Sequence, residues 1–258
     1  HHILARNISR LQAVADAAGL QVRPHIKAHK TPQVAHMQLR AGAVGVTAAK
    51  IGEAEVMADA GVEDIFIANQ IVGPVKLPRL VALARRVPRL STAVDSVECA
   101  AGLNEAFSAA GLRLSVLVEV DTGAGRCGVL PDGPCLEIAR LLDTLPGVRF
   151  DGLQGFEGHT VLIEDDDQRN SATREAMELL TGTGRYIEEH GLPVPIISGG
   201  GTGTYDLSGT LDGMDEIQAG TYPTMDWRYK NVRPEFDIAL SVLATCISAA
   251  EPSRAVLD

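Results

Sequence analysis

The strongest constraint on the fold is the regular alternation of short apolar segments with longer amphipathic ones along most of the 258-residue chain. An opening helical stretch over Ile3–Ala18 precedes the first apolar segment. Repeated strand–helix units place a parallel sheet beneath helices, and eight such units predict a closed (β/α)8 barrel, the TIM barrel. The eight expected strands are Val22–Ala28, Val44–Ala49, Asp64–Asn69, Leu90–Asp95, Leu114–Asp121, Arg149–Phe156, Pro195–Gly200 and Glu216–Gly220.

An open, doubly wound sheet is the structural alternative. That fold normally places a glycine-rich turn directly after its first strand. Here the first strand carries Lys27, and the glycine-rich turns come late, which favours the barrel. Only 4% of the residues are aromatic, so the core must consist of aliphatic side chains, as parallel strands prefer. The expected helices include Gly52–Ala60, Val75–Arg86, Val97–Ala110, Cys135–Leu145 and Arg169–His190.

The pattern changes after Gly220. Arg233-Pro234-Glu235 interrupts it, and Phe236–Ser248 has the composition of one long strand with no helix after it. We therefore expect residues 1–232 to form the barrel and residues 233–258 to begin a C-terminal β domain. Both ends read as interrupted elements, so we also expect the chain to be part of a longer protein.

The net charge and the cysteine content limit the kinds of binding partner and the cell compartment that we expect. The net charge of −10 argues against nucleic acid and against an anionic membrane surface, and no apolar run is long enough to span a membrane. The four cysteines show no CxxC spacing and no disulfide framework. Reduced thiols in a cytoplasmic protein are the expectation.

The segment around Lys27 is the first candidate for chemistry. If Val22–Ala28 is a strand, then Arg23, His25 and Lys27 share one face. We expect this like-charge crowding to lower the pKa of the Lys27 amine and to free it as a nucleophile. An exposed basic edge strand is the alternative interpretation.

Two glycine-rich turns follow the last two expected strands. Ser198–Tyr205 contains three consecutive glycines and two threonines, and Gln218–Tyr222 contains Gly220. In a barrel of this kind, the loops after strands seven and eight commonly bind phosphate. Tight turns explain glycines equally well when each turn is considered alone, but two turns at this corner favour an anion site.

Strands five and six supply further candidates. Arg126 follows the carboxylates Glu119 and Asp121 and is expected to contact either them or a ligand, and a purely structural ion pair is the alternative. His159 is a candidate acid/base group or a residue that stacks on a flat ligand; a hydrogen bond to Glu157 is the other possibility. Asn69 and Gln70 are expected to support the same face.

A lysine, an arginine and a phosphate cradle together predict pyridoxal 5′-phosphate as cofactor. The lysine would form a Schiff base with its aldehyde, and the glycine turns would hold its phosphate.

Five segments carry a family resemblance: RPHIKAHKTP, VEVDTGAGRCGV, GLQGFEGHT, SGGGTGTYD and EIQAGTYPTMD. In this order they resemble the alanine-racemase-like, fold type III family of pyridoxal phosphate enzymes, in the branch of D-threonine aldolase and D-serine dehydratase. The resemblance implies that Lys27 is the Schiff-base lysine and that Arg126 contacts the phenolic oxygen of the cofactor. Gln218 stands where alanine racemases have an arginine facing the pyridine nitrogen, a difference that tells against simple alanine racemization. The other implied cofactor-binding positions are Gly200, Gly201, Thr202, Gly203, Gly220, Thr221 and Tyr222.

The resemblance implies a lyase that acts on D-configured β-hydroxy amino acids, by retro-aldol cleavage or by elimination. Lys27, Arg126 and His159 are its expected catalytic residues. It also implies a homodimer and a divalent metal held by a C-terminal domain whose ligands would lie beyond Asp258, so no metal ligand is assigned here. Three alternatives remain: an amino-acid racemase, a non-catalytic pyridoxal phosphate-binding barrel of the cofactor-homeostasis type, and a barrel that uses Lys27 with a sugar phosphate.

Overall fold

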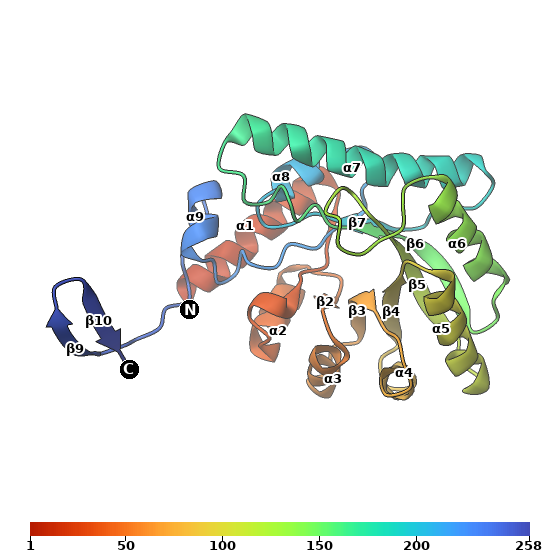
Figure 1. Ribbon diagram of the computed structural model, residues 1–258, viewed down its shortest axis with the longest axis horizontal. Helices are drawn as coiled ribbons and strands as arrows, with labels where there is room; N and C mark the ends of the chain where they lie inside the picture. The colour runs from red at the N-terminus through yellow and green to blue at the C-terminus, as the bar shows by residue number, and fades with distance from the viewer.

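The computed structural model describes all 258 residues and confirms the barrel (Figure 1). Eight parallel strands form one sheet in the order β1-β8-β7-β6-β5-β4-β3-β2, so each strand lies beside its neighbours in the sequence. Seven of the eight expected strands are found within a few residues of their predicted bounds. The strands are β1 (Gln21–Val22), β2 (Val46–Ala48), β3 (Asp64–Gln70), β4 (Arg89–Val94), β5 (Leu114–Val120), β6 (Val148–Gly155), β7 (Ile197–Gly199) and β8 (Glu216–Ile217).

Helices cover the outside of this sheet (Figure 1). Their apolar faces pack on the strands and form a main core of 50 buried residues that is dominated by aliphatic side chains, beside a second cluster of 3. No helix is both long and apolar enough to cross a membrane. The helices are α1 (His2–Ala18), α2 (Pro32–Ala41), α3 (Ile51–Asp59), α4 (Lys76–Ala84), α5 (Val97–Ala109), α6 (Gly133–Thr144), α7 (Asp166–Glu189), α8 (Tyr205–Ser208) and α9 (Trp227–Val232).

The barrel closes between β1 and β2 by single hydrogen bonds. The N–H of Val44 donates to the carbonyl of Val22 at 3.0 Å, and the N–H of Thr47 donates to the carbonyl of Pro24 at 2.9 Å. His25 and Thr47 form an isolated parallel bridge. These bonds bring the loop that carries Lys27 next to the end of β2.

The first expected strand, Val22–Ala28, is wrong beyond Val22. Pro24 has no N–H to donate to a sheet, and Ile26–Ala28 form a short 3₁₀ turn, η1. The ring nitrogen Nδ1 of His25 accepts the backbone N–H of Lys27 at 3.3 Å and so caps this turn. Consequently Arg23 and Lys27 do not share a strand face.

Arg23 instead belongs to a buried ion cluster at the amino-terminal end of the barrel. Its Nε lies 3.0 Å from each carboxylate oxygen of Glu216, and its Nη1 donates to Asp64. Glu216 and Asp64 are the first residues of β8 and β3. The cluster therefore lies at the end of the barrel opposite the carboxyl ends of the strands, where barrels of this kind carry their sites.

The long strand expected over Phe236–Ser248 is also wrong for most of its length. The Phe236 side chain is fully buried and packs edge-on against Tyr205, with ring centroids 5.3 Å apart. Phe236 is therefore apolar because its side chain is part of the barrel core. The strands beyond it, β9 (Cys246–Glu251) and β10 (Arg254–Leu257), pair only with each other and lie apart from the barrel in Figure 1. The division into a barrel over 1–232 and a β domain from 233 stays a prediction.

Candidate active site

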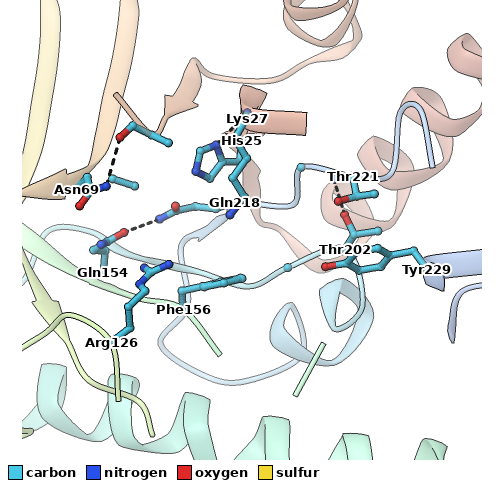
Figure 2. Close-up of a pocket in the computed structure, with 14 residues that line it drawn as sticks. His25, Lys27, Asn69, Arg126, Gln154, Phe156, Thr202, Gln218, Thr221 and Tyr229 are labelled. Atoms are coloured by element: carbon cyan, nitrogen blue, oxygen red, sulfur yellow. Dashed lines mark hydrogen bonds between the residues drawn. The ribbon is translucent and has the colours of Figure 1, made fainter. Parts of the chain in front are cut away.

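A cavity opens at the carboxyl ends of the strands, with an empty volume of about 690 Å³ that includes the solvent at its mouth. Figure 2 shows its lining side chains converging from both sides of the barrel. The wall contains two cationic side chains, Lys27 and Arg126, and no Asp or Glu. It therefore suits a ligand with negative charge. Of the sequence-predicted residues, it gathers Lys27, Arg126, Gly201, Thr202, Gln218, Gly220 and Thr221.

Lys27 is exposed as a residue, and its side chain forms part of the cavity wall (Figure 2). Its Nζ is 4.8 Å from the centroid of the Phe156 ring. Loss of solvation lowers the pKa of the amine, and the positive charge of Arg126 lowers it further. The strand pattern predicts a lowered pKa for Lys27, and the pKa is lowered. The cause differs from the predicted one: it is burial together with the charge of Arg126, and Arg23 does not contribute.

The two histidines beside Lys27 are held neutral. Burial lowers the pKa of His25 to about 3, with a contribution from the charge of Lys27, and burial lowers the pKa of His29 to about 4. A neutral His25 ring keeps Nδ1 as an acceptor for the Lys27 backbone, so the ring holds the position of the lysine without adding charge.

Arg126 shares the Phe156 ring with Lys27, with its guanidinium carbon 5.8 Å from the ring centroid. Behind it, Glu119 is buried, and its Oε1 lies 3.4 Å from the Arg126 Nη2. Gln70 donates to the other carboxylate oxygen at 2.5 Å. The Arg126 side chain is 59% exposed, so this anchored guanidinium still has donors directed at the cavity. Arg126 can therefore pair with Glu119 and contact a ligand at the same time.

The turns after β7 and β8 are joined through Thr202. The Thr202 Oγ1 accepts the backbone N–H of Thr221 at 3.0 Å and of Tyr222 at 3.1 Å. Since the oxygen already accepts two bonds, its own hydrogen is left to donate to a ligand in the cavity. A Cβ on Gly220 would lie 2.6 Å from the His25 carbonyl oxygen, so only glycine lets this turn approach the loop after β1.

Gln218 and Gln154 form the neutral floor of the cavity (Figure 2). The Gln218 Nε2 donates to the Ser198 Oγ at 2.9 Å and lies 3.5 Å from the Gln154 Oε1. The floor thus presents amide groups in place of a charged side chain.

Four sequence-predicted residues do not line the cavity. Gly200 has a φ of +80°, which lets the chain turn. A Cβ on Gly203 would lie 1.9 Å from the carbonyl oxygen of Val161, so this position also requires glycine. Both residues therefore set the backbone of the turn without lining the cavity. The fully buried Tyr222 accepts a hydrogen bond from Gln38 at 2.9 Å. His159 is exposed and faces Gly123, with no hydrogen bond to Glu157.

The role of Glu157 was missed from the sequence, as was the place of Gln154, Phe156 and Tyr229 in the cavity wall. The carboxyl group of Glu157 is fully buried beneath the glycine turn, where Oε1 accepts the N–H of Gly201 at 3.0 Å and the hydroxyl of Thr204. Its Oε2 has no hydrogen-bond partner. Burial raises the pKa of this carboxyl group. A charged residue between Phe156 and Gly158, directly after a buried strand, is the sequence signal that could have identified it.

These residues fit pyridoxal 5′-phosphate. An amine with a lowered pKa, an arginine and a glycine-lined turn with a free hydroxyl donor surround one cavity that contains no carboxylate. No group of three or more His, Cys, Asp or Glu side chains in the structure could hold a metal ion.

Comparisons with known proteins agree with this geometry. The family model described as alanine racemase, N-terminal domain, matches residues 2–226. D-threonine aldolase of Arthrobacter sp. is 38% identical over 98% of this chain and 67% of its own length. 3-hydroxy-D-aspartate aldolase of Paracoccus denitrificans (strain Pd 1222) is 32% identical over 99% of this chain and 68% of its own length. The crystal structure of D-threonine aldolase from Filomicrobium marinum superimposes with a TM-score of 0.93 at 36% identity, covering 97% of this chain and 68% of that one. The chain thus spans about two thirds of the length of these relatives.

Proposed function

We propose that this chain, which belongs to the alanine racemase N-terminal domain family, is a pyridoxal phosphate-dependent lyase that acts on D-configured β-hydroxy amino acids. The observation that carries the proposal is the convergence of the Lys27 amine, Arg126 and the Thr202 turn on one cavity without a carboxylate. Relatives above 30% identity that have assigned reactions are aldolases or a dehydratase, whereas the alanine racemases are 26% identical.

The cofactor contacts follow from the lining of the cavity. The Lys27 amine would hold the aldehyde of the cofactor, and Thr202, with the turns at Gly201 and at Gly220 and Thr221, would hold its phosphate. Arg126 would face the phenolic oxygen and Gln218 the ring nitrogen. When bound, the cofactor supplies an electron-accepting ring that stabilises negative charge at the substrate Cα.

The chain itself contributes proton transfer and positioning. The lowered pKa of Lys27 increases the fraction of neutral amine, which is the form that can accept a proton near the substrate. His25 holds the Lys27 backbone, and Glu119 holds Arg126 from behind. His159 stays a proposed acid/base group, although it is exposed beside Gly123 and does not line the cavity.

Retro-aldol cleavage is the reaction we favour, because aldolases are found at 38% and 32% identity. In this reaction the β-hydroxyl proton is removed, the Cα–Cβ bond breaks and Cα gains a proton. Elimination of the β-hydroxyl group is the second candidate, because D-threo-3-hydroxyaspartate dehydratase of Delftia sp. (strain HT23) is 34% identical.

Product analysis separates the two reactions. With D-threonine, the purified protein supplied with pyridoxal 5′-phosphate should release glycine and acetaldehyde. Release of pyruvate from D-serine would instead establish elimination. Formation of neither product, with divalent metal present, would refute the lyase assignment, and conversion of D-alanine to L-alanine would replace it with racemization.

Three features of the whole protein are also proposals. A divalent metal is included because a variant of D-threo-3-hydroxyaspartate dehydratase is described in a metal-free form, but the residues here provide no cluster for it and no step is assigned to it. A homodimer is proposed from the family resemblance. A cytoplasmic location is supported by four free cysteines.

A further inference from the structure

A second cavity adjoins the cofactor cavity at the ends of β2 and β3. Its empty volume is about 1130 Å³, open solvent included, and it shares Ala49 and Asn69 with the cofactor cavity. We call it the cationic groove. Its charged lining consists of four cations and one carboxylate: Lys30, Lys50, Lys76, Arg79 and Glu53.

Two of these cations are already compensated. Arg79 donates to both carboxylate oxygens of Glu55, at 2.9 and 2.5 Å. Lys30 lies 3.1 Å from Glu53, whose other oxygen accepts the Ala49 N–H at 2.9 Å. Both acidic side chains near the groove therefore have partners.

Lys50 and Lys76 have no carboxylate within ion-pair distance anywhere in the structure. Lys50 directly precedes α3, and Lys76 is the first residue of α4, so the positive helix N-termini add to the same potential. In a chain with a net charge of −10, this groove is a local region of the opposite sign.

Strand order fixes where the groove lies relative to Lys27. The loop that carries Lys27 follows β1, which pairs with β8 on one side and contacts β2 on the other. The phosphate-binding turns follow β7 and β8, whereas the groove follows β2 and β3. A substrate held next to Lys27 therefore has the phosphate turns on one side and uncompensated positive charge on the other.

We propose that the cationic groove binds a second acidic group on the substrate, so that the substrate class is D-configured β-hydroxy amino acids with a carboxylate on the β-carbon, as in 3-hydroxy-D-aspartate. The inference rests on the proposed lyase function. Cleavage of that substrate breaks Cα–Cβ and yields glycine and glyoxylate: the β-hydroxyl oxygen becomes the aldehyde oxygen, its proton leaves, and Cα gains a proton. The β-carboxylate keeps its charge throughout, so the groove should act on binding more than on the chemical step.

The test compares 3-hydroxy-D-aspartate with D-threonine in the wild-type protein and in a Lys50→Gln, Lys76→Gln double variant. A charge-assisted hydrogen bond is worth enough to change affinity about tenfold or more. The double variant should raise KM for 3-hydroxy-D-aspartate about tenfold or more and leave kcat and KM for D-threonine within about twofold. Arg10→Gln, which removes an exposed cation on α1 far along the chain from the groove, is the matched control and should change neither substrate.

A readout independent of turnover accompanies the kinetics. D-aspartate has the second carboxylate but no β-hydroxyl group, so it should perturb the cofactor absorbance of the wild-type protein at lower concentration than D-alanine does, and the double variant should lose this difference. Pyridoxal 5′-phosphate affinity should be the same in both proteins.

The outcomes separate the two claims. Cleavage of D-threonine together with an unchanged KM for 3-hydroxy-D-aspartate in the double variant would overturn the groove assignment and leave the lyase function standing. An equal loss on both substrates, or a changed oligomeric state in the double variant, would also overturn it by showing a structural role. Cleavage of neither substrate by the wild-type protein would instead overturn the lyase function.

Discussion

The Thr202 hydroxyl oxygen accepts the backbone N–H of Thr221 at 3.0 Å, which fastens the turn after β7 to the turn after β8. The N–H of Tyr222 reaches the same oxygen at 3.1 Å. One side chain therefore connects two loops and keeps its own hydroxyl hydrogen available for a ligand.

Replacing Thr202 with Val should weaken cofactor binding about tenfold or more, because it removes the hydroxyl donor and leaves two N–H groups without an acceptor. Thr202→Ser keeps the hydroxyl group and should retain most of the affinity. Titration with pyridoxal 5′-phosphate, followed by absorbance, measures both. Equal affinities of the two variants would show that the hydroxyl group does not contact the phosphate.

Lys27→Ala should abolish covalent attachment of the cofactor. Borohydride reduction of the wild-type protein with pyridoxal 5′-phosphate, followed by peptide mass spectrometry, should place the adduct on Lys27. Lys30→Ala is the control, because Lys30 lies in the same loop but pairs with Glu53. An adduct of undiminished yield in Lys27→Ala would exclude Lys27 as the attachment site.

His25 should make the protein less stable in mild acid. Its folded pKa is lowered to about 3 from an ordinary value of 6.5, so between these pH values the unfolded chain binds a proton that the folded chain does not. Its contribution to stability is therefore complete above pH 6.5 and is lost as the pH falls toward 3. In His25→Asn, the fall in the free energy of unfolding from pH 7 to pH 5 should be smaller by about 1–2 kcal/mol.

Chemical denaturation at each pH measures this slope. His2→Asn, at the exposed start of α1, is the control and should keep the wild-type slope. A slope in His25→Asn that matches the wild-type protein would show that the buried ring does not bear this linkage.

Glu157 should have the opposite dependence on pH. Its folded pKa is raised above the ordinary 4.5, so the folded protein binds this proton more tightly, and stability is lost as the pH rises above 4.5 through the folded value. Glu157→Gln keeps an acceptor for the Gly201 N–H and cannot ionise. Its stability relative to the wild-type protein should therefore increase with pH over that window.

Glu157→Ala provides the contrast, because it leaves the Gly201 N–H unpaired and should cost about 1–3 kcal/mol. Thermal unfolding without cofactor compares the three proteins. A stability difference between Glu157→Gln and wild type that is constant with pH would contradict a raised pKa.

Arg23→Met should destabilise the protein by about 3–5 kcal/mol, because it leaves the buried Glu216 without its cation, whereas Asp64 keeps its ion pair with Arg89 at 2.8 Å. Arg149→Met is the matched control: Arg149 pairs with Asp151 but is 57% exposed, and its loss should cost less than about 1 kcal/mol. Denaturant unfolding gives both values. Similar costs for the two variants would show that the cluster at the closed end contributes little.

The sequence predicts most of the barrel because its strands are continuous apolar runs, whose type does not depend on distant contacts. Leu114–Val120 is an example: five of its seven side chains are aliphatic, and six are buried. The first strand was predicted too long because Val22–Ala28 alternates like a strand, whereas Pro24 and the His25 cap turn the chain. An alternating pattern of apolar and polar residues gives no sign of a local hydrogen bond between a side chain and the backbone.

The candidate site also contains residues that the sequence could identify and residues that it could not. Lys27, Arg126 and the turn at Thr202 were predictable because their residue types match the chemistry of a carbonyl cofactor that bears a phosphate. Glu157 was not, because its role depends on lying beneath Gly201, which is 44 residues away in the sequence. Phe236 was assigned to a strand for a similar reason, since its contact with Tyr205 is visible only in three dimensions.

Lys27 lies between the ends of β8 and β2, so the proposed phosphate turns and the proposed substrate groove are on opposite sides of it. The loops on the β8 side are joined through the hydrogen bonds of Thr202, whereas the loops on the β2 side carry the long side chains of Lys50 and Lys76. If the proposed roles are correct, residues at positions 50 and 76 should be exchangeable without loss of cofactor affinity. For protein engineering, these two positions are the first to randomise when a new amino acid is to be accepted by an otherwise intact catalyst.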